Sequence, residues 1–233
     1  MDFKTILSNG VEITSSGTTG TPKKIFRTPE NLAKCNQVAI EAQKISKNSS
    51  VLTVTRMTHA GGLLAQSLPA YSIGVDVEIK QFNPFTFLKD LHNHTHTFLA
   101  PAQMQALMQT KNFDTCDLSG KWILGGSDPV PWEIIEAFVS KGAIVQPNWG
   151  MSEIGPIAIN IVFDSMDKVQ QVKQSAPEGY TVLGDTYWCE WKIDNFELVV
   201  KSDTCIYDDW FYTKDLVSLD MRKRMYYHKR ILE

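Results

Sequence analysis

The stretch Ser15-Ser16-Gly17-Thr18-Thr19-Gly20-Thr21-Pro22-Lys23-Lys24 is the most informative part of this sequence. It follows a short β-like piece at 11–13 and precedes a typical helix start, in which Thr28 is the N-cap and Pro29 the first helical residue. Its glycines let the backbone turn tightly, while its hydroxyls and the Lys23 ammonium can hold several phosphate oxygens at once. We therefore expect a phosphate-binding loop here. A flexible Ser/Thr/Gly surface loop is the alternative.

Two familiar phosphate-binding patterns do not fit this stretch. A Walker A loop reads G-x-x-x-x-G-K-[ST], and counting from Gly17 the second glycine is replaced by Pro22 and the final Ser/Thr by Lys24. The dinucleotide-binding pattern G-x-G-x-x-G does not occur in the sequence. Any phosphate site must therefore be of another kind.

Outward from this loop, segments typical of strands alternate with segments typical of helices. We expect strands at 51–55, 75–79, 97–100, 122–124 and 143–145, and helices at 28–45, 63–70, 84–91, 102–108 and 131–138. This alternation predicts an α/β fold, in which a mostly parallel sheet is covered by helices on both faces.

The pattern changes after Gly155. Short β-rich segments are expected at 157–163, 180–183, 187–193 and 197–201, with turn residues between them and without a long helix. A boundary near 156–165 predicts two parts, an α/β subdomain at 1–158 and a small β-rich subdomain at 159–233. The basic run at 222–230 is interpreted as a solvated hairpin face, with nucleic-acid binding as the alternative.

Composition narrows the function classes. The 233 residues are 43% hydrophobic and 21% charged, which excludes disorder as the main state. Lys and Arg number 23 against 26 Asp and Glu, so we expect neither a nucleic-acid partner nor a membrane surface. The four cysteines are scattered and the start lacks a secretory signal, which favours reduced thiols and a cytoplasmic location. The close spacing of His92, His94 and His96 suggests a metal site, but accidental spacing is the preferred interpretation.

Three more motifs follow the loop in order along the chain. They are Gly125-Gly126-Ser127, Asn148-Trp149-Gly150-Met151-Ser152-Glu153 and Asp209-Trp210-Phe211-Tyr212-Thr213-Lys214-Asp215-Leu216. With the loop, they resemble the motif set of the adenylate-forming superfamily: acyl-CoA synthetases, nonribosomal adenylation domains and luciferases. The spacing is most like that of o-succinylbenzoate-CoA-ligase-type members. The sequence departs from the family patterns at Ser15 (Thr), Lys24 (Gly), Trp149 (Tyr), Lys214 (Gly) and Lys229 (Gly).

The resemblance implies a role for each matching residue. Ser16, Thr18, Thr19 and Lys23 would hold the β- and γ-phosphates of ATP, Trp149 would stack on adenine opposite Gly125–Ser127, and Ser152 would bond the α-phosphate. Asp215 would accept both ribose hydroxyls, Arg230 would also contact the ribose, and Glu153 would hold Mg²⁺. The implied nucleotide-binding set is completed by Gly17, Gly20, Gly125, Gly126, Ser127 and Gly150. The implied catalytic set is Glu153, Ser152, Lys23 and His59.

Simpler interpretations remain open for three of these residues. The alternatives are that Trp149 is a core residue, that Asp215 is a turn or cap residue, and that His59 is a buried histidine whose ring nitrogens are satisfied.

The implied activity is that of an AMP-forming ligase core. It would bind ATP-Mg²⁺ and a small carboxylic acid to form an acyl-adenylate, with coenzyme A as a further acceptor in intact homologues. Family members carry a longer N-terminal subdomain and a C-terminal domain that begins near the position of Arg230 and supplies a lysine. We therefore expect weakened activity unless a partner chain provides that lysine. The alternative is a catalytically weak or inactive AMP/ATP-binding module, a sensor or half of a split ligase.

Overall fold

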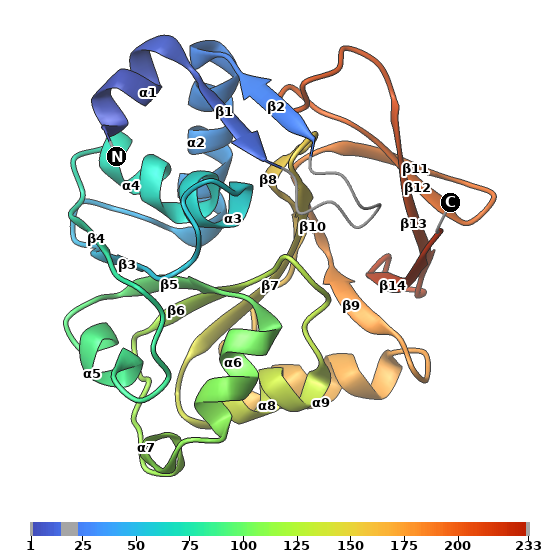
Figure 1. The fold of residues 1–233 in the computed structure, drawn as a ribbon. Helices are drawn as coiled ribbons and strands as arrows, with labels where there is room; N and C mark the ends of the chain where they lie inside the picture. The colour runs from blue at the N-terminus through green and yellow to red at the C-terminus, as the bar shows by residue number, and fades with distance from the viewer. Residues whose placement is uncertain (1, 15–22, 232–233) are drawn as a thin grey trace.

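The computed structural model describes residues 2–14 and 23–231, and Figure 1 shows its fold. A seven-stranded sheet carries helices on both faces: α2, α3 and α4 lie on one side and α5, α6, α8 and α9 on the other. A two-stranded and a five-stranded antiparallel sheet complete the structure. The expected α/β class with a mostly parallel sheet is confirmed.

The helices are α1 (Phe3–Asn9), α2 (Pro29–Gln43), α3 (Ala60–Gly62), α4 (Leu68–Ser72), α5 (Phe87–Leu91), α6 (Pro101–Met108), α7 (Lys111–Asp114), α8 (Trp132–Ser140) and α9 (Met166–Ser175), with a π-helical turn at Leu63–Ser67. The strands are β1 (Val11–Thr14), β2 (Lys24–Arg27), β3 (Val51–Thr53), β4 (Val77–Ile79), β5 (His96–Leu99), β6 (Trp122–Gly125), β7 (Ile144–Met151), β8 (Gly155–Asn160), β9 (Thr181–Gly184), β10 (Thr186–Tyr187), β11 (Glu190–Asp194), β12 (Glu197–Lys201), β13 (Phe211–Leu219) and β14 (Met225–Arg230). Every strand and helix expected between 28 and 145 has a counterpart.

The large sheet has the strand order β10-β8-β7-β6-β5-β3-β4. Strands β4, β3, β5, β6 and β7 run parallel, and β8 and β10 continue the sheet antiparallel. Every residue of β3, β5 and β6 is buried, because helices cover both faces of the sheet. The parallel strands therefore end at one common edge, where the loops that follow them gather.

Helix α2 begins as the sequence predicts. The Thr28 hydroxyl accepts a hydrogen bond from the Asn31 N–H at 3.2 Å, and Pro29 occupies the first turn. The helix ends at Gln43, two residues before the expected end, because Lys44 adopts a left-handed conformation with φ of 53°. Its buried side includes Leu32, Cys35 and Ala39, which fixes it against the sheet.

The expectation that no long helix follows Gly155 is wrong. Helix α9 spans ten residues, is capped by Ser165, and packs beside α8, where Lys173 pairs with Glu136 at 2.8 Å. Only Val169 and Val172 of this helix are buried. A single pair of inward apolar residues among polar neighbours gives a weak helical pattern, which explains the error.

The five-stranded sheet has the order β11-β12-β13-β14-β9 and is antiparallel throughout. Between β9 and β11 the chain returns to the large sheet as β10, which pairs with β8. The proposed division after residue 158 falls inside β8, and the separation into two subdomains stays a prediction. None of the helices described in residues 2–14 and 23–231 is long and apolar enough to cross a membrane.

Candidate functional site

The Gly125–Ser127 turn lies beside the Trp149 segment. Gly125 ends β6 and pairs with Pro147 of the parallel strand β7, so both segments leave the sheet at the same edge. A Cβ atom at Gly126 would lie 3.2 Å from the Asn148 carbonyl oxygen. Exposed Ser127 has a left-handed φ of 74°, which turns the chain away from the strand. The two motifs expected to flank adenine are thus neighbours.

Trp149, Asp215 and Arg230 form one hydrogen-bonded cluster. The Trp149 indole N–H donates to Asp215 Oδ2 at 2.9 Å, and Arg230 Nε donates to Asp215 Oδ1 at 2.9 Å. A second Arg230 nitrogen lies 3.3 Å from Oδ2. Trp149 of the seven-stranded sheet therefore meets two residues of the β13–β14 hairpin, of which Asp215 is 66 residues further along the chain.

The Asp215 carboxylate is only 3% exposed. Burial raises the pKa of Asp215 above its usual value, although Arg230 and the Trp149 N–H favour the ionised form. Asp215 lies within β13, rather than in a turn or at a helix cap. Trp149 is 8% exposed and also packs in a hydrophobic cluster with Ile154 and Leu183. Trp149 is therefore a core residue, and its stacking on adenine stays a prediction.

Gly150 closes the tight β7–β8 connection. A Cβ atom there would lie 2.6 Å from the carbonyl oxygens of both Gly155 and Pro156, so only glycine fits. Ser152 and Glu153 occupy the turn that follows, and both are half-buried. The Glu153 carbonyl oxygen accepts a hydrogen bond from Ile206 N–H at 2.9 Å, which holds the backbone of this turn.

Sequence reasoning missed Arg27, which is fully buried. Its guanidinium donates to the Ser152 carbonyl at 2.6 Å, to the Thr204 carbonyl at 2.8 Å and to the Asn31 side chain. Burial lowers the pKa of Arg27, and within the described part of the chain no carboxylate lies in ion-pair range. In β2, Ile25 is buried, Phe26 exposed and Arg27 buried, so the strand's alternation turns the arginine inward, but the adjacent apolar residues Ile25 and Phe26 gave no sequence signal for this direction.

His59 lies where the first strand ends. Its Nδ1 atom is 2.8 Å from the carbonyl oxygen of Thr14, and its ring is half-buried. Strands β1 and β2 pair Thr14 with Lys24, which places Lys23 next to the same end of the hairpin. The predicted phosphate-binding residues Ser16, Gly17, Thr18, Thr19 and Gly20 lie outside the described residues.

The His59 segment also approaches the Gly125–Ser127 turn. A Cβ atom at Gly61 would lie 3.5 Å from the Ser127 hydroxyl and 2.8 Å from the Phe98 ring. The structure therefore brings three of the predicted motifs to one edge of the sheet, namely the His59 segment, the Gly125–Ser127 turn and the Trp149–Glu153 segment.

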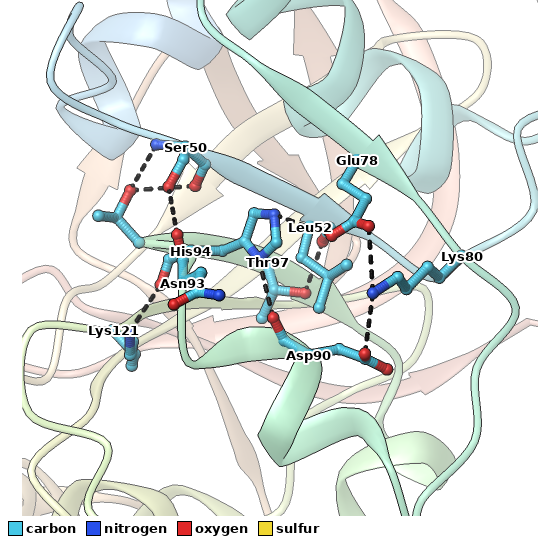
Figure 2. A network of polar contacts seen from close by, with 10 residues as sticks. Ser50, Leu52, Glu78, Lys80, Asp90, Asn93, His94, Thr97 and Lys121 are labelled. Carbon is cyan, nitrogen blue, oxygen red and sulfur yellow. Dashed lines mark hydrogen bonds and ion pairs between the residues drawn. The ribbon is translucent and has the colours of Figure 1, made fainter.

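The three histidines do not converge. His94 lies 3.2 Å from Glu78 and bonds the Asp90 carbonyl oxygen, in the polar network with Lys80 that Figure 2 shows. His96 instead bonds the Gln43 carbonyl oxygen at 3.0 Å. Throughout residues 2–14 and 23–231, no group of three or more His, Cys, Asp and Glu side chains is arranged to hold a metal ion.

The basic run at 222–230 forms a hairpin, as expected, through β13 and β14. Its face is not simply solvated, however, because Arg224 is buried and pairs with Asp220 at 2.7 Å, while Arg230 pairs with Asp215. Two of its cations are therefore paired with carboxylates within the fold.

Comparisons with known proteins agree with this arrangement. The AMP-binding enzyme family matches residues 12–187. The chain is 29% identical over 177 residues to indoleacetate–CoA ligase of Aromatoleum aromaticum, covering 73% of this chain and 35% of that protein. It is 29% identical over 151 residues to a long-chain-fatty-acid–CoA ligase of Bacillus subtilis, covering 61% of this chain and 27% of that protein. The matched part of this chain thus spans about a quarter to a third of the length of these curated relatives.

Solved structures show the same fold. The o-succinylbenzoate-CoA synthetase of Bacillus subtilis in complex with the acyl-adenylate OSB-AMP superimposes with a TM-score of 0.79 at 21% identity, over 97% of this chain and 63% of that one. The N-terminal domain of FACL13 from Mycobacterium tuberculosis gives 0.78 at 18% identity, over 94% and 60%. The resemblance that the motifs indicate is confirmed, and this chain belongs to the family of AMP-binding enzymes.

Proposed function

We propose that this chain forms the nucleotide- and acid-binding part of an AMP-forming ligase that activates a small carboxylic acid. The observation that carries the proposal is the Trp149–Asp215–Arg230 cluster beside the Gly125–Ser127 turn. An aromatic ring, a glycine-rich backbone and a buried carboxylate within one site suit a base and its ribose. This function rests on the site, with the family membership as support.

Each residue group takes one part of the nucleotide. The Trp149 ring and the Gly126 backbone flank adenine, and the ionised Asp215 carboxylate accepts hydrogen bonds from the ribose, with Arg230 beside it. Ser152 bonds the α-phosphate. Lys23 and the loop residues Ser16, Gly17, Thr18, Thr19 and Gly20 hold the β- and γ-phosphates, and Gly150 keeps the backbone close to the ligand.

The Glu153 carboxylate suits a magnesium ion. Mg²⁺ prefers hard oxygen ligands and keeps several waters, so one half-buried carboxylate beside the phosphates fits its needs. Bound there, the ion would offset the negative charge of the phosphates. A neighbour with this fold, the Bacillus subtilis o-succinylbenzoate-CoA synthetase, has been solved in complex with ATP and magnesium ion.

The proposed reaction is an in-line displacement at the α-phosphorus. A carboxylate oxygen of the acid forms a bond to phosphorus while the bond to the bridging oxygen of the β-phosphate breaks. Pyrophosphate leaves with that electron pair, and acyl-adenylate remains. Lys23 and Ser152 stabilise the phosphate charge, and His59 orients the acid at the edge of the phosphate site. Transfer of the acyl group to coenzyme A would follow in the complete ligase.

Aromatic acids are the proposed substrate class. The relatives include indoleacetate–CoA ligase, feruloyl-CoA synthase and 4-coumarate–CoA ligase, whose names specify aryl acids. We place the acid pocket at 59–65, Gly150 and 154–157, and two of these residues, Ala65 and Ile157, belong to a buried apolar cluster with Phe98. Such an apolar lining suits a planar ring.

Carboxylate-dependent exchange of pyrophosphate into ATP tests the reaction, with a panel of aryl acids and fatty acids. Exchange stimulated by an aryl acid supports the ligase. Calorimetry then compares AMP with a non-hydrolysable acyl-adenylate mimic, which should bind far more tightly because the acid pocket contributes. No exchange and equal affinities for the two ligands would establish a nucleotide-binding module without chemistry.

Glu153→Gln tests the magnesium ligand. This substitution should weaken the binding of Mg²⁺-ATP and leave the binding of AMP without magnesium unchanged, because only the carboxylate charge is removed. Equal loss for both ligands would place Glu153 in a structural role instead.

A further inference from the structure

Trp149 and Asp215 belong to different sheets, and one hydrogen bond joins them. Trp149 lies in β7 of the seven-stranded sheet and Asp215 in β13 of the five-stranded sheet. The bond from the indole N–H to Oδ2 is 2.9 Å long and buried. A buried hydrogen bond to an ionised acceptor is among the stronger ones in proteins, so this contact restrains both groups.

Two residues hold the Asp215 carboxylate from different directions. Arg230, on β14, donates to Oδ1, and the Trp149 indole approaches Oδ2. Arg230 contacts both carboxylate oxygens, with Nε 2.9 Å from Oδ1 and a second nitrogen 3.3 Å from Oδ2, so it already limits rotation about the last side-chain bond. The indole N–H is the shorter of the two donors on Oδ2, at 2.9 Å, so it completes the restraint on that oxygen and leaves a defined lone-pair direction for a ligand.

The donor is specific to tryptophan. The family pattern has tyrosine at this position, and a tyrosine ring carries its only donor on the hydroxyl at the far end. An indole instead carries an N–H on the edge of the ring itself, so one side chain offers both an aromatic face and a donor.

We propose that the indole N–H of Trp149 is a positioning group for Asp215, which couples the surface that receives adenine to the carboxylate that receives the ribose. This inference rests on the proposed function and deepens it. Trp149 then contributes to ribose recognition without touching the sugar.

The charged groups around Asp215 set the direction of a pH effect. Arg230 favours the ionised carboxylate and Glu197 disfavours it, while the Tyr227 hydroxyl has a pKa raised by burial and by the Asp215 charge. The Trp149 bond also favours ionisation. Removing that bond raises the pKa of Asp215 further, so nucleotide binding is lost at a higher pH during acidification.

Trp149→Phe is the test, because it keeps an aromatic face and removes the donor. Affinities for ATP and for 2′,3′-dideoxy-ATP, which lacks both ribose hydroxyls, are measured in the full chain. We expect about tenfold weaker binding of ATP and less than about a twofold change for the dideoxy nucleotide. The pH at which ATP binding is lost on acidification should also be higher in this variant than in the wild type.

Trp122→Phe is the matched control. Trp122 also donates a buried indole hydrogen bond, to Gln146 at 2.6 Å, but it lies at the start of β6, away from the Gly125–Ser127 turn. Its loss should leave both nucleotide affinities unchanged. Equal weakening of both nucleotides by Trp149→Phe would assign Trp149 to stacking or packing alone, and an unchanged ATP affinity would also overturn the proposal.

A nucleotide-free measurement separates this inference from the proposed function. The indole ¹H–¹⁵N resonance of Trp149, identified by its loss in Trp149→Phe, should shift in Asp215→Asn and move on acidification. If that resonance behaves so while the wild type binds no nucleotide, both the proposed function and the positioning role fail. If ATP binds but the resonance is insensitive to Asp215, only the positioning role fails.

Discussion

The hairpin of β13 and β14 contains two aspartate–arginine pairs, one near each end. Asp215 and Arg230 are cross-strand partners at the open end, whereas Asp220 and Arg224 flank the turn. Asp220 accepts four hydrogen bonds, from the backbone N–H groups of Arg222 and Arg224, from Arg224 Nε and from the Tyr226 hydroxyl. Its carboxylate is saturated by its own turn.

The two carboxylates therefore differ in what they can still bind. Among the described residues, the Asp215 carboxylate receives donors from Trp149 and Arg230, and burial raises the pKa of Asp215. At Asp220, burial acts in the same direction, but the hydrogen bonds from Arg224 and Arg222 outweigh it and lower the pKa. The same residue pair thus stabilises a turn in one place and keeps an acceptor for a ligand in the other.

The largest difference between the two aspartate–arginine pairs is expected in nucleotide affinity. Asp215→Asn is expected to weaken ATP binding by about 100-fold, because the charged acceptor of the ribose is lost. Asp220→Asn should change the ATP dissociation constant by less than about twofold, since its carboxylate has no lone pair left for a ligand. Titration calorimetry measures both, and equal effects would break the comparison.

The effects on the free energy of unfolding should be in the opposite order, larger for Asp220 than for Asp215. Asp220→Asn is expected to lower the free energy of unfolding by about 2 kcal/mol at pH 7, because an amide nitrogen cannot accept from Arg224 and Tyr226. Asp215→Asn should change it by less than about 0.5 kcal/mol, since burial already disfavours that charge. Urea unfolding of the nucleotide-free chain measures both quantities.

The pH dependence of these stability effects follows from the pKa directions. The pKa of Asp220 is lowered on folding, so its contribution is present above the unfolded value near 4 and is lost as the pH falls through the folded value. The pKa of Asp215 is raised, so the wild type gains stability relative to Asp215→Asn as acid protonates this carboxyl. The test measures the unfolding free energies of both variants relative to the wild type between pH 3 and 7. If the two differences change with pH in the same direction, this prediction is wrong.

The arginines give a smaller contrast. Arg230→Gln should weaken ATP binding by about tenfold, because Asp215 then keeps the Trp149 bond alone. Arg224→Gln should leave ATP affinity within about twofold and lower the melting temperature instead, since its partner Asp220 loses a buried donor. A melting temperature unchanged in Arg224→Gln would show that the turn does not depend on this pair.

The smallest expected effects concern two lysines, one beside each pair. Lys214, next to Asp215, has a φ of 63°, and Lys223, next to Arg224, has a φ of 60°. Glycine adopts this conformation without strain, so Lys214→Gly and Lys223→Gly should each stabilise the chain by about 0.5 kcal/mol. Thermal unfolding measures the shift, and a destabilised Lys214→Gly variant would show that the lysine side chain matters more than its backbone strain.

The sequence predicted much of the fold because its signals were local. The cap at Thr28, the buried strand at Val51 and the apolar face of α8 can each be predicted from a few neighbouring residues. Helix α9 escaped prediction since only Val169 and Val172 face inward. The inward position of Arg27 was not predicted, because Ile25 and Phe26 are both apolar and its partners, the carbonyl groups of Ser152 and Thr204, come from distant parts of the chain.

By itself, the sequence determined the alternation of strands and helices between 28 and 145, the α/β class and the family motifs, because propensity, capping and periodicity act over short distances along the chain. Only the tertiary structure decided that the Trp149 indole bonds Asp215, that Asp220 is saturated and that Arg27 ties β2 to the turn at Ser152. These contacts join segments from different sheets. These hydrogen bonds form only when the sheets pack against each other, and the spacing of residues along the chain does not predict that packing.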